Sequence, residues 1–78
     1  MARNDSRGPG LTIREIEVLQ RMADGKSTAA IADDLSISAG TVQSHVEQIL
    51  GKLAVRSKVE AVLAALRLGL IRARRGSF

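Results

Sequence analysis

The sequence predicts an all-α fold, a single four-helix bundle, and two observations support this prediction. The chain has 78 residues and is 45% hydrophobic, yet it contains one aromatic residue and one proline. Leu, Ile, Val and Ala must therefore fill a small core, and this composition favours helices over sheets. Apolar residues also recur at helical spacing in four stretches, each preceded by a serine or threonine that can cap a helix, and no strand pattern is found.

The composition excludes several functional classes. Without cysteine the chain can form neither a disulfide framework nor a thiolate metal site. It shows no nucleophile–base pair, phosphate-binding loop or metal-ligand cluster, so we expect no enzyme, no catalytic residue, no metal and no cofactor. The longest apolar run, residues 61–66, is far shorter than the ~20 residues that span a bilayer, and the polar N-terminus is not a signal peptide. We therefore expect a cytoplasmic protein without a membrane partner or a small-molecule ligand.

Positive charge is concentrated near the C-terminus. The formal net charge is +4, and residues 51–78 carry seven of the twelve Lys and Arg but one of the eight Asp and Glu. A basic end of this kind suits a polyanion such as nucleic acid, or an acidic membrane surface. A solvated surface that keeps the protein soluble explains the charge equally well, so charge alone leaves these alternatives open.

The chain divides into three segments. Residues 1–10 contain two glycines, the proline and mixed charges, and are predicted to form a flexible leader or linker. Residues 11–71 form the folded domain. Residues 72–78 have no periodicity and are predicted to form a basic, flexible tail.

The first helix is predicted to begin at a capping box. The Thr12 hydroxyl can accept a bond from a free amide, and the Glu15 side chain can reach back to another. Apolar residues follow at helical spacing up to Asp24, and Gly25 ends the helix. Capping explains Glu15 better than a catalytic role does.

The second and third helices are separated by the short segment 36–38. Ser27 can cap the second helix and Ser38 the third, which starts near Ala39. The residues expected to face inward are Ile31, Ala32 and Leu35 on the second helix, and Val42, His45, Val46, Ile49 and Leu53 on the third. The opposite face of the third helix carries Gly40, Gln43, Ser44, Glu47 and Gln48. For the single histidine, a packed and hydrogen-bonded position is preferred to a metal-binding one.

The fourth helix is predicted to open with a second capping box, from Ser57 to Glu60, and to end near Gly69. The residues expected on its core side are Val59, Val62, Leu63, Leu66 and Leu70. This packing would leave Ala61, Ala65 and Leu68 on a flank with little polar cover, where small side chains allow a second helix to approach. We therefore predict that these three residues form a weak homodimer contact.

Together, the second and third helices predict a helix-turn-helix that binds double-stranded DNA. The shared core would hold the third helix so that its polar outer face can enter a major groove about 12 Å wide. The amides at the two helix starts could hold backbone phosphates. The candidate DNA contacts are Lys26, Ser27, Thr28, Ser38, Thr41, Gln43, Ser44, Glu47, Gln48, Lys52 and Lys58.

The run from Leu11 to Ile71 resembles the LuxR/GerE-type DNA-binding domain, which is also the output domain of NarL-like response regulators. The residues that carry the resemblance are Leu11-Thr12-x-Arg14-Glu15-x-Glu17-Val18-Leu19, Ala23-x-Gly25-x-Ser27, Ile31-Ala32-x-x-Leu35-x-Ile37-Ser38, Thr41-Val42-x-x-His45-Val46-x-x-Ile49, Lys52-Leu53-x-Val55 and Glu60-Ala61. The resemblance implies a four-helix domain whose third helix is the recognition helix and whose fourth is a dimerisation-type helix. It implies promoter binding as a dimer and transcriptional control, with RNA polymerase as a further partner.

Two positions depart from the family pattern. This chain has Gln43 where the family commonly has Lys, and Glu47 where it often has a basic or polar residue. The outer face of the third helix therefore carries no positive charge. Gln43 can still bond adenine and Glu47 can accept a bond from cytosine, although phosphates repel the carboxylate.

Two other functions remain as alternatives. A sigma-factor region that contacts a promoter element shares the Leu-Thr-x-Arg-Glu opening, but it usually ends at its helix-turn-helix, whereas a capped apolar helix follows here. A helical protein-interaction or anti-regulator module could keep this fold and lose its DNA affinity, which Gln43 and Glu47 would allow.

Overall fold

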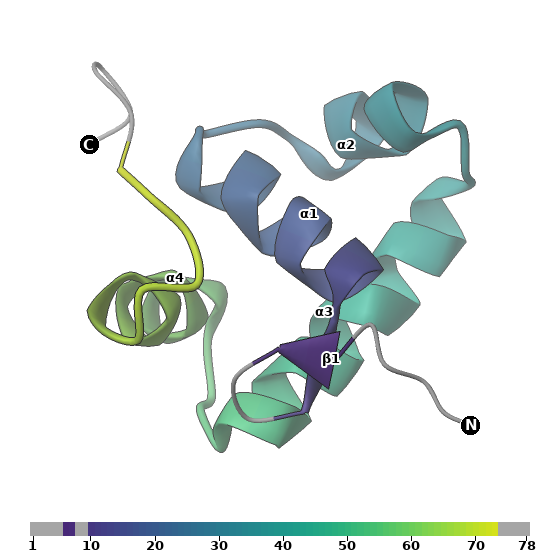
Figure 1. Cartoon of the computed structure of the whole chain (residues 1–78). Coiled ribbons are helices and arrows are strands. Elements are labelled where there is room, and N and C mark those ends of the chain that lie inside the picture. The colour runs from purple at the N-terminus through teal and green to yellow at the C-terminus, as the bar shows by residue number, and fades with distance from the viewer. Residues whose placement is uncertain (1–5, 8–9, 74–78) are drawn as a thin grey trace.

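The computed structural model describes residues 6–7 and 10–73, and four α-helices make up most of this part of the chain. They are α1 (Ile13–Ala23), α2 (Thr28–Leu35), α3 (Ala39–Leu53) and α4 (Lys58–Arg67). In Figure 1, α1 lies between α2 and α4, and α3 runs behind it. The prediction of an all-α, four-helix bundle with a helix-turn-helix is confirmed.

Two short strands precede α1, where the sequence shows no strand pattern. β1 (Ser6–Arg7) pairs antiparallel with β2 (Leu11–Thr12). A two-residue strand is too short to show the alternation of apolar and polar residues that identifies a strand in a sequence. Part of the predicted leader thus pairs with the folded domain, and its residues 1–5 and 8–9 lie outside the described residues.

Each helix begins at the capping residue that the sequence predicts. The side chains of Thr12, Ser27, Ser38 and Ser57 each accept a hydrogen bond from the backbone amide three residues further on, at 3.0–3.1 Å. These bonds satisfy amides that have no acceptor within their own helix. The predicted helix starts are therefore confirmed.

The two predicted capping boxes differ in their second bond. At α1 the Glu15 carboxylate accepts a bond from the Thr12 amide at 2.9 Å, which completes the box. At α4 the Glu60 carboxylate instead accepts from the amide of Arg56, at 2.9 Å, so the second box is incomplete. Ser57 has a φ of −139°, compared with −82° at Thr12, and this rotation brings the preceding amide within reach of the glutamate.

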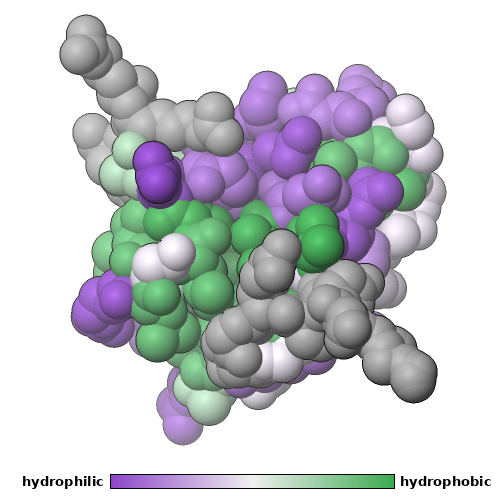
Figure 2. All heavy atoms as spheres, in the orientation of Figure 1, coloured by the Kyte–Doolittle hydropathy of each residue, from purple (hydrophilic) through white to green (hydrophobic). Residues whose placement is uncertain are grey.

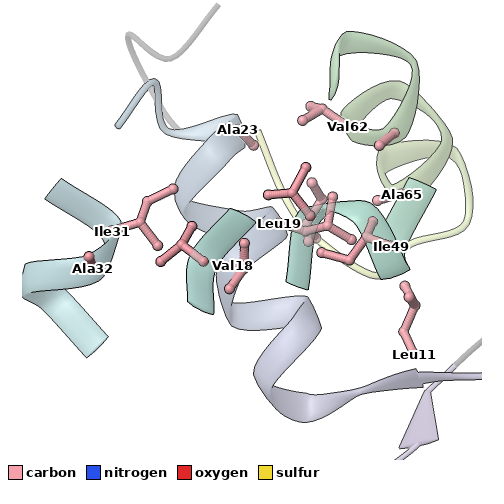
Figure 3. Packing of buried hydrophobic residues seen from close by; sticks show 13 residues of the cluster. Leu11, Val18, Leu19, Ala23, Ile31, Ala32, Ile49, Val62 and Ala65 are labelled. Atoms are coloured by element: carbon pink, nitrogen blue, oxygen red, sulfur yellow. The ribbon is translucent and has the colours of Figure 1, made fainter. Parts of the chain in front are cut away.

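The core is built around α1. Figure 3 shows the buried residues of α1 in the middle, with Ile31 and Ala32 of α2 on one side and Val62 and Ala65 of α4 on the other. The buried apolar residues are Leu11, Val18, Leu19, Ala23, Ile31, Ala32, Val42, Val46, Ile49, Ala61, Val62, Ala65 and Ile71. Since α1 contacts each of the other three helices, its position fixes theirs.

The predicted orientation of α4 is correct for Val62, which is buried, and for Leu66 and Leu70, which pack against the core, but it is wrong at four other positions. Val59 and Leu63, expected in the core, are 68% and 45% exposed, whereas Ala61 and Ala65, expected on the surface, are fully buried. The helix carries apolar residues on most of its circumference, so periodicity could not decide which side faces inward. The alanines face the core because their small side chains let α4 approach α1 and α3 closely, and of the three predicted dimer residues only Leu68 is exposed.

The chain after α4 is fixed at its start. Ile71 is buried, the Arg72 amide donates to the Gln20 side-chain oxygen at 3.1 Å, and the Gln20 side-chain nitrogen donates to the Arg72 carbonyl at 2.8 Å. The prediction of a flexible tail from residue 72 is therefore wrong for Arg72, and its residues 74–78 lie outside the described residues.

An ion pair between the buried Glu15 and the exposed Lys52 joins the start of α1 to the C-terminal part of α3. The Lys52 ammonium donates to both carboxylate oxygens of Glu15, at 2.8 and 3.1 Å, and the Glu15 side chain is 2% exposed. The same carboxylate holds the Thr12 amide, so a single side chain caps one helix and binds another. A carboxylate without such partners would be costly at this depth.

We predict that Lys52→Met, which keeps the stem and removes the charge, lowers the free energy of unfolding by about 2 kcal/mol, because it leaves a buried carboxylate without its cation. Chemical denaturation measures this loss. Lys58→Met is the matched control, since Lys58 is exposed and makes no ion pair among the described residues, and it should change stability by less than about 0.5 kcal/mol. Equal effects of the two substitutions would contradict the prediction.

We also predict that the C-terminal part of α3 can be stabilised at two positions. Gly51 is exposed inside the helix and an added Cβ would meet nothing within 4 Å, so Gly51→Ala should stabilise the domain by about 1 kcal/mol. Ala54 has a φ of 57°, which favours glycine, so Ala54→Gly should also raise the melting temperature. Gly25→Ala is the control. Gly25 has a φ of 84°, which disfavours alanine, so this substitution should lower the melting temperature. Thermal unfolding of the three variants checks the signs.

Candidate nucleic-acid interface

The turn between α2 and α3 sets the relative direction of these two helices. Ser36 ends α2 in the left-handed conformation, with a φ of 58°, and the Ile37 amide donates to the Ala32 carbonyl at 3.0 Å. Ile31 and Val42 are buried in the shared core. A short turn with apolar residues on both sides is the arrangement that a helix-turn-helix requires.

The two faces of α3 are separated as the sequence predicts. Val42, Val46 and Ile49 are buried, while the outer residues Gly40, Gln43, Ser44, Glu47 and Gln48 are all exposed. Among the described residues, the outer side chains make no hydrogen bond or ion pair with the rest of the protein. Their donors and acceptors are free to meet the edges of bases, which is what direct readout in a major groove needs.

His45 lies between the two faces. It is half-buried, so its predicted inward position is confirmed in part, but the imidazole makes no hydrogen bond within the described part of the chain. The same residues contain no group of three His, Cys, Asp or Glu side chains that could hold a metal ion.

The starts of α2 and α3 place amides at the surface. Ser27 and Ser38 each cap one amide, and the Ser38 and Thr41 hydroxyls lie 2.9 Å apart, within hydrogen-bond distance. The remaining amides of each first turn have no acceptor within the helix. Helix starts of this kind bind phosphate oxygens readily.

The predicted lysine contacts have different surroundings. Lys52 pairs with Glu15 at 2.8 Å while its side chain is 34% exposed, so its charge is partly compensated within the protein and its role as a phosphate contact stays a prediction. Lys26 lies 3.3 Å from a carboxylate oxygen of Asp34, and this oxygen also lies 3.3 Å from the Arg21 guanidinium. Lys58 has no ion pair among the described residues.

A further exposed cation, Arg56, is not among the predicted contacts. Arg56 lies exposed in the connection between α3 and α4, and within the described residues its guanidinium makes no ion pair. Its position in the basic C-terminal part of the sequence was a signal for it. No local pattern, in contrast, reveals that Lys52 pairs with Glu15, because 37 residues separate them.

The structure brings some predicted contacts together and leaves others apart. Lys26, Ser27, Thr28 and Lys58 line one groove between the start of α2 and α4. The outer side chains of α3 form a second group along their own helix.

None of the helices in the described part of the chain has the length and apolar character that crossing a membrane requires.

Comparisons with known proteins agree with this geometry. The family model of bacterial regulatory proteins of the luxR family matches residues 9–65. The chain is 52% identical over 52 residues to the transcriptional regulatory protein DesR of Bacillus subtilis, which covers 67% of this chain and 26% of that protein. It is 43% identical over 63 residues to the probable transcriptional regulatory protein NarL of Mycobacterium tuberculosis, covering 81% of this chain and 29% of the relative.

The solved structure of the transcription factor GerE superposes with a TM-score of 0.82 at 37% identity and covers 87% of this chain and 100% of that one. The chain spans about a quarter of the length of the curated relatives that it matches. Both relatives are named as transcriptional regulatory proteins. The chain belongs to the luxR family of bacterial regulatory proteins, and its folded region is the helix-turn-helix domain of that family.

Proposed function

We propose that this domain binds double-stranded DNA with α3 in the major groove and thereby regulates transcription. One observation carries the proposal: the outer face of α3 presents four exposed polar side chains, Gln43, Ser44, Glu47 and Gln48, which have no partner among the described residues. A helix of this shape fits the major groove, and amides and carboxylates can read base edges.

Phosphate contacts come from the helix starts. The first-turn amides of α2 and α3, together with Ser27, Thr28, Ser38 and Thr41, would position the domain on the backbone. Lys58 and Arg56, which make no ion pair among the described residues, supply most of the attraction to phosphate, and Lys26 and Lys52, each paired with a carboxylate, supply less. We expect about three phosphates to be neutralised, which gives a slope of log affinity against log salt of about −3.

Self-association through α4 accompanies DNA binding in this proposal, with a different contact from the one that the sequence predicts. Ala61 and Ala65 are buried, so they cannot contact a second copy. Of the three predicted dimer residues, Leu68, which is 57% exposed, can still do so. A small contact would form a weak dimer, stabilised when two domains occupy successive turns of one DNA face. The expected cytoplasmic location and a contact with RNA polymerase belong to this same proposal.

The DNA-binding proposal is tested with a labelled pool of random duplexes, from which bound fragments are selected, followed by a salt titration. Glu47→Lys should strengthen binding to all duplexes and weaken any preference for cytosine, because it replaces a repelled carboxylate with a phosphate partner. Glu17→Lys makes the same change of charge on α1 and should have a smaller effect. A folded protein that binds no duplex at low salt would refute the proposal and favour an interaction module without DNA affinity.

Replacement of Leu68 tests the dimer. Leu68→Gln should leave the affinity for a single half-site unchanged and remove cooperative binding to two half-sites about 34 Å apart, because it places a polar group in the contact. Leu63→Gln alters another exposed leucine of the same helix and should keep the cooperativity. The measurement is the stoichiometry and steepness of binding on the paired site. One protein per paired site at saturation, in the unmodified chain, would exclude the dimer.

A further inference from the structure

A groove of about 370 Å³ opens between α4, the end of α1 and the start of α2, and none of the residues in the proposed major-groove contact lines it. Its floor and walls are apolar, with contributions from Met22, Ile31, Val46, Val62 and Leu63. Val59, which is 68% exposed, stands at its edge. Figure 2 shows apolar side chains gathered over α4 on one face of the molecule. Val59 and Leu63 are the side chains that the sequence places in the core and the structure leaves outside it.

The polar residues of the groove favour a negatively charged occupant. Lys26 and Lys58 both line it, and no Asp or Glu is among the lining residues. Lys58 makes no ion pair within the described residues, whereas Lys26 pairs with Asp34, which lies outside the groove lining. Ser27, the capping residue of α2, also lines the groove, so the positive end of that helix dipole lies beside it. An apolar channel with positive charge at its edge is complementary to an apolar stripe with negative charge beside it.

We propose that this groove binds an amphipathic helix of a partner protein, with two or three apolar side chains in the channel and Asp or Glu residues facing Lys26 and Lys58. A helix in a groove uses apolar residues at i, i+4 and i+7 as anchors, and a channel of this volume holds side chains of that number and size. Val59 and Leu63, one turn apart on α4, form one wall along which such a helix packs.

The chemistry of the groove disfavours two other occupants. A phosphate group has no apolar part, so it would leave the floor of the channel exposed to water. A second copy of this chain, related by a twofold axis through the groove, would bring the two pairs of lysines toward each other. An acidic amphipathic helix would cover the apolar floor with its apolar side chains and pair its carboxylates with the lysines at the edge.

Binding of this helix competes with DNA. Lys26, Ser27, Thr28 and Lys58 line the groove and are also proposed phosphate contacts, so an occupant that covers them removes part of the DNA-binding surface. This step rests on the proposed function, whereas binding of the helix itself does not.

The test uses the 78-residue chain, labelled with ¹⁵N, and a synthetic helical peptide with leucines at i, i+4 and i+7 flanked by glutamates. Matched peptides carry glutamine or lysine in place of glutamate. The glutamate peptide should bind about tenfold more tightly than the glutamine peptide, and the lysine peptide more weakly still. Backbone signals of residues 25–28 and 58–63 should shift on binding.

Two leucine variants locate the binding site. Leu63→Gln should weaken the glutamate peptide about tenfold, because a polar group replaces an apolar wall residue, and Leu68→Gln, which lies outside the groove lining, should bind as the unmodified chain does. Equal affinity for the three peptides, no binding, or a loss on Leu68→Gln would overturn the proposal. The proposal would also be overturned if sedimentation showed that the unmodified chain self-associates and that Leu63→Gln removes this self-association.

Competition is measured separately by adding unlabelled duplex to the complex. Displacement of the peptide supports the overlap of the two surfaces. Binding of peptide and duplex together overturns the competition, and failure of the duplex to bind the free chain refutes the proposed function without affecting the peptide result.

Discussion

The buried carboxylate of Glu15 is the constraint on which the arrangement of this domain depends. It accepts a hydrogen bond from the Thr12 amide and two from the Lys52 ammonium, so it fixes the start of α1 and ties it to α3. Burial of a charged group is unfavourable unless all its partners are in place, so the native geometry is strongly preferred over slipped alternatives. Since α1 and α3 each contact all the other helices, this site joins the two central elements of the bundle.

This constraint also shapes the surface that faces DNA. Lys52 forms an ion pair with Glu15, and Lys26 and Arg21 both form ion pairs with Asp34. Among the described residues, few cations near α3 therefore remain without a carboxylate partner. Attraction to phosphate then depends on helix starts and on residues at the beginning of α4. In the proposed complex, a second copy on the same DNA would compensate for this modest attraction, because two weak contacts on one molecule reinforce each other.

The packing of α4 has a second consequence. Turning Ala61 and Ala65 inward brings the backbones close, and it leaves larger apolar side chains, Val59, Leu63 and Leu68, at the surface. Leu63 and Val59 line a groove with a basic edge, while Leu68 does not. The same helix therefore exposes apolar side chains on two distinct flanks, one for each of the two proposed contacts.

The sequence by itself determined the helices, their caps and the exposed face of α3, because these depend on neighbours within four residues: a hydroxyl and an amide, or apolar side chains one turn apart. It also identified the family, through residues at fixed spacing. Tertiary structure alone decided three features. The pairing of Glu15 with Lys52 joins residues 37 positions apart, the orientation of α4 depended on how closely α1 and α3 let it approach, and the two-residue strands are held by pairing with each other. The first two are set by distant contacts, which local periodicity does not encode. The strands pair positions only four and six apart, but they are too short to show a period.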